Sequence, residues 1–144
     1  MNLPPLFRDR PLPVQVILGG VVPAAFGAVV GLLLGVSAAA YWGIQIVAVA
    51  GGILAGFEHR DGWGGADRGL VGGALFGTFL LVAHELSGTH ATVALPSFPP
   101  MLAVFTAIIG MLLGALGGRL GRALRERPAA QQVGKTARQL EPID

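Results

Sequence analysis

The sequence contains no cysteine among its 144 residues. Without thiols the chain cannot form disulfides, hold a metal through thiolates or use a cysteine nucleophile. Only three histidines remain for any metal chemistry. We therefore expect neither a metal site nor a cofactor.

Charge is also scarce, at 12% of residues, whereas 53% are hydrophobic and the mean hydropathy is +0.67. Soluble domains carry about 25% charged residues, so this composition favours a lipid bilayer as the solvent. Four spans of ~20 residues use most of the length and leave no room for a second domain. The few basic residues flank apolar segments, so we expect no nucleic-acid partner.

Four long apolar runs, separated by proline, glycine and charged residues, predict an all-α integral membrane bundle of four helices arranged as two transmembrane hairpins. A short N-terminal segment precedes the transmembrane domain, and a basic tail follows it, with 128–144 expected to be disordered. The predicted boundaries are 1–13 for the N-terminal segment, 14–120 for the transmembrane domain, 14–36, 39–57, 69–86 and 101–120 for the spans, and 121–144 for the tail.

The positions of the ten Lys and Arg residues predict the topology. All lie in the N-terminus, the second connection or the C-terminus. By the positive-inside rule these segments are cytoplasmic, with both termini inside. An alternative is a signal peptide cleaved after Ala40, but the apolar run Val14–Val36 exceeds the usual ~7–15 residues. High Ala, Gly and Arg usage favours the cytoplasmic membrane of a prokaryotic cell.

Two internal similarities suggest a parallel repeat of a two-helix unit. Gly27–Gly35 aligns with Gly69–Gly77 at an offset of 42, and Gly51–Arg60 aligns more loosely with Gly110–Arg119. Duplication and glycine-rich bias both explain the matches.

The central segments GGILAG, at Gly51–Gly56, and GADRGLVGGALFG, at Gly65–Gly77, carry a family resemblance. They resemble small glycine-rich four-span prokaryotic membrane proteins of unknown function. The resemblance implies the fold and no activity.

Small residues recur four apart in every predicted span and therefore return to one helix face. Such faces let backbones approach closely, in this bundle or in a homo-oligomer or a complex with another membrane protein. In the second span the series begins with Ala48. The predicted packing residues are Gly27, Gly31, Gly35, Gly52, Gly56, Gly69, Gly73, Gly77, Gly110, Gly114 and Gly118.

Pro23 lies near the middle of the first predicted span. It has no N–H, so the Gly19 carbonyl loses its usual helical partner and a kink is expected. A hinge and a static bend are both consistent with this pattern.

With the last span taken to end at about Gly118, Glu85 is the only acidic or basic side chain inside the predicted spans. With Gln45, His84 and His90 it forms a candidate outward-facing polar pocket for a cation or a proton. Alternatively, these four side chains simply reach water and headgroups at the interface.

The charged connection offers an ion-pair patch or docking site, or else a solvated turn, through Glu58, His59, Arg60, Asp61, Asp67 and Arg68. After the last span, a run of arginines is expected to anchor the helix to anionic lipid headgroups at the cytoplasmic face, namely Arg119, Arg122, Arg125 and Arg127.

Catalytic motifs are missing. The stretch HELSGTH has Gly88 where the zinc motif HExxH needs histidine, and Ser87 lies in no GxSxG turn. We therefore predict a protein that is not an enzyme. The expected function is that of a structural or accessory membrane component acting through helix–helix association, and the alternative is a small oligomeric channel or transporter for a proton or cation.

Overall fold

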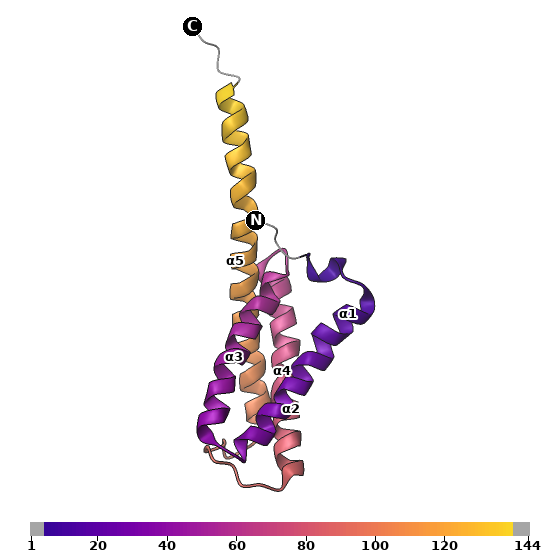
Figure 1. The fold of residues 1–144 in the computed structure, drawn as a ribbon, viewed down its shortest axis with the longest axis vertical. Helices are drawn as coiled ribbons and strands as arrows, with labels where there is room; N and C mark the ends of the chain where they lie inside the picture. Colours follow the sequence, from indigo (N-terminus) through magenta and orange to yellow (C-terminus); the bar gives the residue numbers. More distant parts are fainter. Residues whose placement is uncertain (1–4, 140–144) are drawn as a thin grey trace.

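The computed structural model describes residues 5–139, and it describes side chains up to Glu126. Every regular element within 5–139 is helical (Figure 1). In chain order the elements are a 3-10 turn (Phe7–Asp9), α1 (Leu12–Val16), a π-helical turn (Ile17–Val21), α2 (Val22–Leu34), α3 (Ala38–Phe57), α4 (Gly62–Ser87) and α5 (Met101–Gln139).

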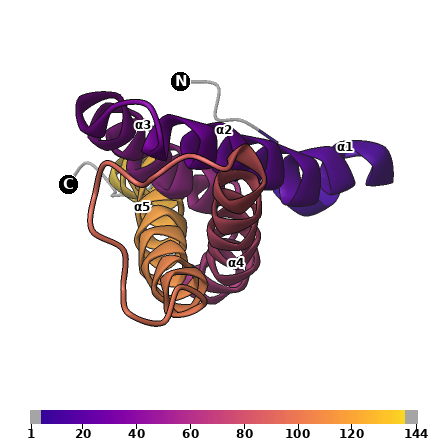
Figure 2. The same cartoon turned by 90° about the horizontal axis from the view of Figure 1, so that it is seen from below.

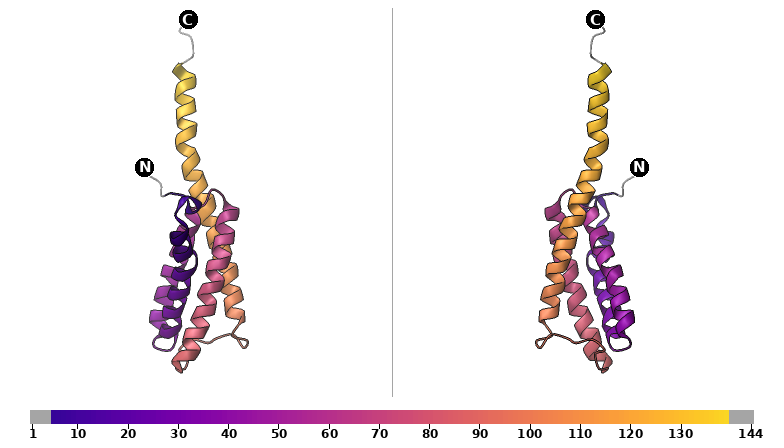
Figure 3. Two further views of the ribbon diagram at one scale, coloured as in Figure 1. Left: turned by 90° about the vertical axis from the view of Figure 1, so that its right-hand side faces the viewer. Right: turned by 90° about the vertical axis from the view of Figure 1, so that its left-hand side faces the viewer.

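Four helical stretches are long and apolar enough to cross a membrane: Leu12–Leu34, Ala38–Phe57, Gly62–Ser87 and Met101–Glu126. The predicted all-α fold with four span-length helices is confirmed at this level. The N-terminal segment, the α3–α4 turn and the projecting end of α5 lie together, at what we call the basic end (Figures 1 and 3). The connections 35–37 and 88–100 lie at the opposite end, which we call the loop end.

Local signals explain several helix ends. The Ala40 N–H donates to Ser37 Oγ at 3.4 Å at the start of α3, and the Gly64 N–H donates to Asp61 Oδ1 at 2.8 Å at the start of α4. Gly88 ends α4 in the left-handed conformation, with φ at 64°, which glycine adopts without steric cost. Pro99 and Pro100 precede α5, which begins at Met101 as predicted.

Two helices extend beyond the predicted bounds. The expected charged loop at 58–68 is a turn of only Glu58–Asp61, because Asp61 caps α4 and lets it begin at Gly62. Asp67 and Arg68 are therefore helical residues. The expected disorder from 128 onward is contradicted as far as Gln139, where α5 ends, and the three Ala and three Gln of 128–139 favour a helix.

The helices that pack most closely are α4 with α5, α2 with α4, and α3 with α5. The consecutive helices α2 and α3 meet much less. Figure 2, which looks along the bundle, shows α2 and α3 on one side of it and α4 and α5 on the other. α2 therefore packs mainly against α4, and α3 packs mainly against α5.

Glycine permits these close pairs. A methyl group at Gly27 or Gly31 would collide with the carbonyl oxygens of Phe76 or Leu80 on α4. The same holds at Gly56 against Gly114, and at Gly69 and Gly73 against α5. All eleven predicted packing glycines have atoms of another segment within 3.4 Å of an added Cβ, although Gly35 meets Thr89 of the loop rather than a helix. Gly65 and Gly117, outside the predicted set, make equally close contacts.

The apolar core lies toward the loop end. Val30, Leu34, Tyr41 and Leu80 are buried there, from α2, α3 and α4. The 88–100 connection covers them, and Thr92 donates from its N–H and its Oγ1 to the Leu34 carbonyl at 2.9 and 2.8 Å. These bonds satisfy a free carbonyl at the end of α2.

Candidate functional site

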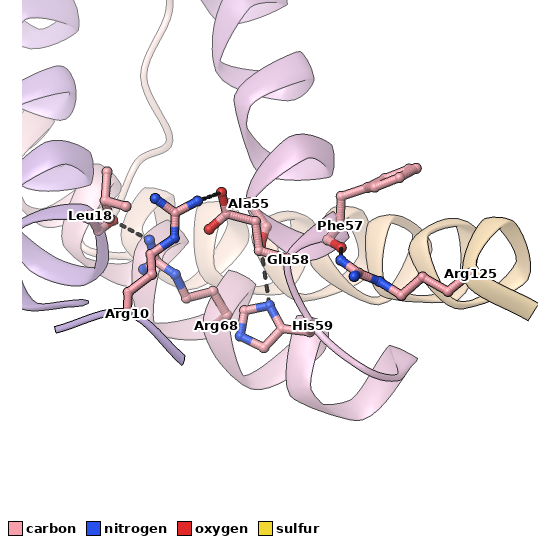
Figure 4. A network of polar contacts seen from close by, with 8 residues as sticks. All are labelled: Arg10, Leu18, Ala55, Phe57, Glu58, His59, Arg68 and Arg125. Carbon is pink, nitrogen blue, oxygen red and sulfur yellow. Dashed lines mark hydrogen bonds and ion pairs between the residues drawn. The ribbon is translucent and has the colours of Figure 1, made fainter. Parts of the chain in front are cut away.

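The clearest polar arrangement of the molecule is built on Arg68 of α4 (Figure 4). Its Nη1 donates to the Gly19 carbonyl at 2.9 Å, and its Nη2 donates to the Leu18 carbonyl. Both carbonyls belong to the π-helical turn immediately before Pro23. A side chain of one apolar helix therefore bonds to the backbone of another.

Pro23 explains why these two carbonyls are available. The Gly19 carbonyl would bond to the N–H four residues later in an α-helix, and the Leu18 carbonyl would bond to the N–H five residues later in a π-helix. Both positions are Pro23, which has no N–H. Backbone groups at membrane depth need a partner inside the protein, and Arg68 supplies it.

The N-terminal segment closes over Arg68. The Phe7 ring lies 4.7 Å from the Arg68 guanidinium carbon and stacks on His59 at a centroid distance of 5.4 Å. The Phe7 N–H donates to the Glu58 carbonyl at 2.8 Å, and Arg10 Nη2 pairs with Glu58 Oε1 at 2.5 Å. The segment before α1 is thus tied to the α3–α4 turn by three kinds of contact.

His59 completes this cluster from the turn. Its Nδ1 donates to the Ala55 carbonyl at 3.2 Å, because a carbonyl can only accept. Burial lowers the pKa of His59, and the positive charge of Arg68 lowers it further, whereas the bond to Ala55 acts in the opposite direction. The neutral imidazole is therefore the favoured form at neutral pH.

A cavity of about 500 Å³, which we call the lateral groove, lies between α2, α3, α4 and α5. Arg68 belongs to its lining, as does Pro23. Among the lining residues only Trp42, Gln45, Arg68 and Thr106 have polar side-chain atoms. Thr106 Oγ1 bonds to carbonyls of its own helix, and Gln45 Nε2 donates to Tyr41 Oη at 3.0 Å.

The four residues of the predicted outer pocket form no hydrogen bond or ion pair with one another among the described contacts. Gln45 is half-buried and faces the lateral groove, whereas Glu85 and His90 are exposed. His84 is buried at 6% exposure, and its Nδ1 has no hydrogen-bond partner among the described residues. Neighbouring positions on a helix point about 100° apart, which explains how His84 and Glu85 differ.

The predicted anchoring arginines are partly engaged with the protein itself. Arg122 pairs with Glu126 at 2.7 Å on the surface of α5, and Arg125 donates to the Phe57 carbonyl at 3.4 Å. Arg119 is exposed, with its Cγ 3.1 Å from the Cβ position of Gly62. The side chain of Arg127 lies outside the described residues.

Of the charged connection, Glu58, His59, Asp61 and Arg68 make structural bonds, whereas Arg60 and Asp67 are exposed. Sequence reasoning missed the role of Arg68. The signal was present, because Pro23 leaves carbonyls without partners and Arg68 adjoins a predicted span. Nothing in the sequence identifies which helix supplies the donor.

No group of three or more His, Asp or Glu side chains that could hold a metal ion is found within the described part of the chain. Comparisons of the sequence and fold with protein families, with curated proteins and with solved structures give no match.

Proposed function

We propose that this chain is a non-enzymatic multi-pass membrane protein, a structural or accessory component that acts through helix–helix association in the cytoplasmic membrane of a prokaryotic cell. The observation that carries the proposal is how the polar groups inside the bundle are used. Arg68, Gln45 and Thr106 all bond to the chain itself, and the lateral groove is apolar. Among the described residues, these three polar side chains are therefore already bonded within one copy, which supports association between helices as the role of the bundle.

The surface of α3 supports association with a further helix. Only 6% of its apolar stretch is buried, against 22% in α4 and in α5. Ile46 is 72% exposed, and the Cβ position of Gly43 has no atom within 4 Å. Lipid tails provide little drive for helices to associate, so close packing at small residues has to provide it.

Cysteine crosslinking in membranes tests this proposal, because the chain has no cysteine of its own. Ile46→Cys places a thiol on the exposed face of α3, and Val71→Cys, at a position 54% exposed on α4, is the matched control. We expect Ile46→Cys to crosslink to a second copy or to another membrane protein, and Gly43→Leu to abolish the product. Equal crosslinking from both positions, or none from either, contradicts association through α3.

A small oligomeric channel or transporter for a proton or cation is the second candidate, because His84 is buried with a ring nitrogen that has no partner among the described residues. A buried imidazole beside the exposed Glu85 is a chemically suitable proton relay. Proton flux into liposomes that Glu85→Gln and His84→Gln both abolish would favour transport. Absence of flux for protons and common cations would favour the accessory role.

Membrane orientation is tested separately. The proposal places both termini in the cytoplasm, so a reporter fused after Asp144 should be active only if it functions inside the cell. A periplasmic or extracellular signal from that fusion contradicts the proposed topology.

A further inference from the structure

The lateral groove is open to the surroundings of the bundle, and this opening suggests a ligand. Its walls include Val22, which is 47% exposed, and Trp42, which is 59% exposed. Residues that line a closed cavity would be covered. In a membrane such an opening faces acyl chains, and leaving it empty would forfeit the dispersion contacts of its lining.

The dimensions of the groove select a thin occupant. Along α3 its lining extends from Trp42 to Ala55, a length of ~20 Å. A volume of about 500 Å³ over that length has a mean cross-section of about 25 Å². A helix with its side chains is wider, at ~10–12 Å across. The groove therefore fits one extended hydrocarbon chain more closely than a whole helix.

Part of the space in the groove exists because two of its lining residues are glycines, which have no side chain. An added Cβ at Gly51 would meet no atom within 4 Å, and one at Gly72 would meet only Pro23 Cβ at 4.0 Å. The two glycines belong to α3 and α4, and both line the groove. Larger side chains here would fill the groove without touching the backbone of a neighbouring helix.

Charge selects the headgroup. Arg68 lies at the groove's basic end and bonds to neutral carbonyls, whereas Arg10 and Glu58 pair with each other. Arg68 therefore has no ion pair of its own among the described residues. Two guanidinium groups and one carboxylate give this cluster a net positive charge, and of the three side chains Arg68 lines the groove. Basic pockets between transmembrane helices on the cytoplasmic side bind anionic headgroups.

We propose that the lateral groove binds one acyl chain of an anionic phospholipid, with the phosphate of its headgroup at Arg68. This site differs from the arginines after the last span, which are exposed or bonded elsewhere at the surface. The proposal does not rest on the accessory function, because crosslinking through α3 and lipid binding in the groove are measured separately.

Native mass spectrometry of the delipidated full-length protein tests the proposal. The probes are phosphatidylglycerol and phosphatidylcholine with identical palmitoyl and oleoyl chains. We expect one phosphatidylglycerol to bind saturably, and phosphatidylcholine to bind about fivefold more weakly, since one basic residue contributes ~1 kcal/mol toward an anionic lipid. Equal binding of the two lipids overturns the assignment of the headgroup.

Groove-filling variants locate the binding site. Gly51→Leu should weaken phosphatidylglycerol binding by about tenfold or more. Gly20→Leu is the matched control, because the Cβ position of Gly20 also has no atom within 4 Å but Gly20 does not line the groove. Gly72→Leu fills the groove from α4, and it replaces Gly51→Leu in this test if Gly51→Leu does not fold. Wild-type binding by a folded groove-filling variant overturns the proposal.

A second copy is the rival occupant. A lipid-free wild-type dimer that becomes monomeric in Gly51→Leu would place a neighbouring chain in the groove and overturn the lipid proposal.

Discussion

Glycines at the α4–α5 interface and in the lateral groove can have opposite surroundings, even though Gly73 belongs to both. At Gly73 an added Cβ would collide with the Thr106 carbonyl, because the two helix backbones touch. At Gly51 the same atom would meet nothing within 4 Å. Spacing alone does not distinguish the two cases. One glycine brings helices together, and the other keeps a space between them.

The largest expected effect is on stability, and it tests the difference between Gly73 and Gly51 directly. Gly73→Leu should destabilise the protein by about 3 kcal/mol, because the new side chain has to push α4 away from the α5 backbone. Gly51→Leu should change the free energy of unfolding by less than about 0.5 kcal/mol. Unfolding in mixed micelles, followed by circular dichroism, measures both. Equal losses from the two variants would show that the groove is closed in the membrane.

The next effect concerns the bond between α4 and the π-helical turn. Arg68→Met should cost about 2 kcal/mol, since it leaves the Leu18 and Gly19 carbonyls without a donor. Pro23→Ala restores a backbone N–H, so the same Arg68→Met change should cost about 1 kcal/mol less in that background. A double-mutant cycle of Arg68 and Pro23 measures the coupling energy between them. Additive losses would mean that Arg68 does not compensate for Pro23.

A smaller difference in stability is expected between the two ion pairs of the basic end. Glu58→Gln should cost about 1 kcal/mol, because the Arg10–Glu58 pair is only 23% and 22% exposed and ties the N-terminal segment down. Glu126→Gln is the control, since its pair with Arg122 is 60% and 63% exposed and follows the i,i+4 spacing. That change should cost no more than about 0.5 kcal/mol. Identical losses would contradict a structural role for the buried pair.

The smallest expected effect depends on pH. Because burial lowers the pKa of His59, the unfolded chain takes up the proton more readily than the folded one. This contribution to stability is complete above the unfolded pKa of about 6.5 and is lost as the pH falls below it. His59→Gln should therefore lose less stability than the wild type between pH 7.5 and pH 5.5. Parallel pH profiles would exclude His59 as the titrating group.

Several features of the fold could be predicted because they depend on residues close in sequence. Long apolar runs gave four helices, proline gave the start at Met101, and the four-residue spacing gave faces on which glycines such as Gly69 and Gly110 now meet. The start of α4 was misplaced because Asp61 was counted as loop charge, whereas its carboxylate caps the helix. The orphan carbonyl before Pro23 was also predictable. Its partner was not, because Arg68 lies 49 residues from Gly19 along the chain.

The sequence by itself determined that the chain is helical and lipid-compatible, because the backbone has to satisfy its own hydrogen bonds wherever side chains are apolar over ~20 residues. The tertiary structure decided which glycines touch a neighbouring helix, as Gly73 does, and which have open space around them, as Gly51 does. That choice depends on how α2 and α3 pack against α4 and α5 rather than on each other. Helix pairing of this kind arises from contacts between distant segments, and neighbouring residues do not specify it.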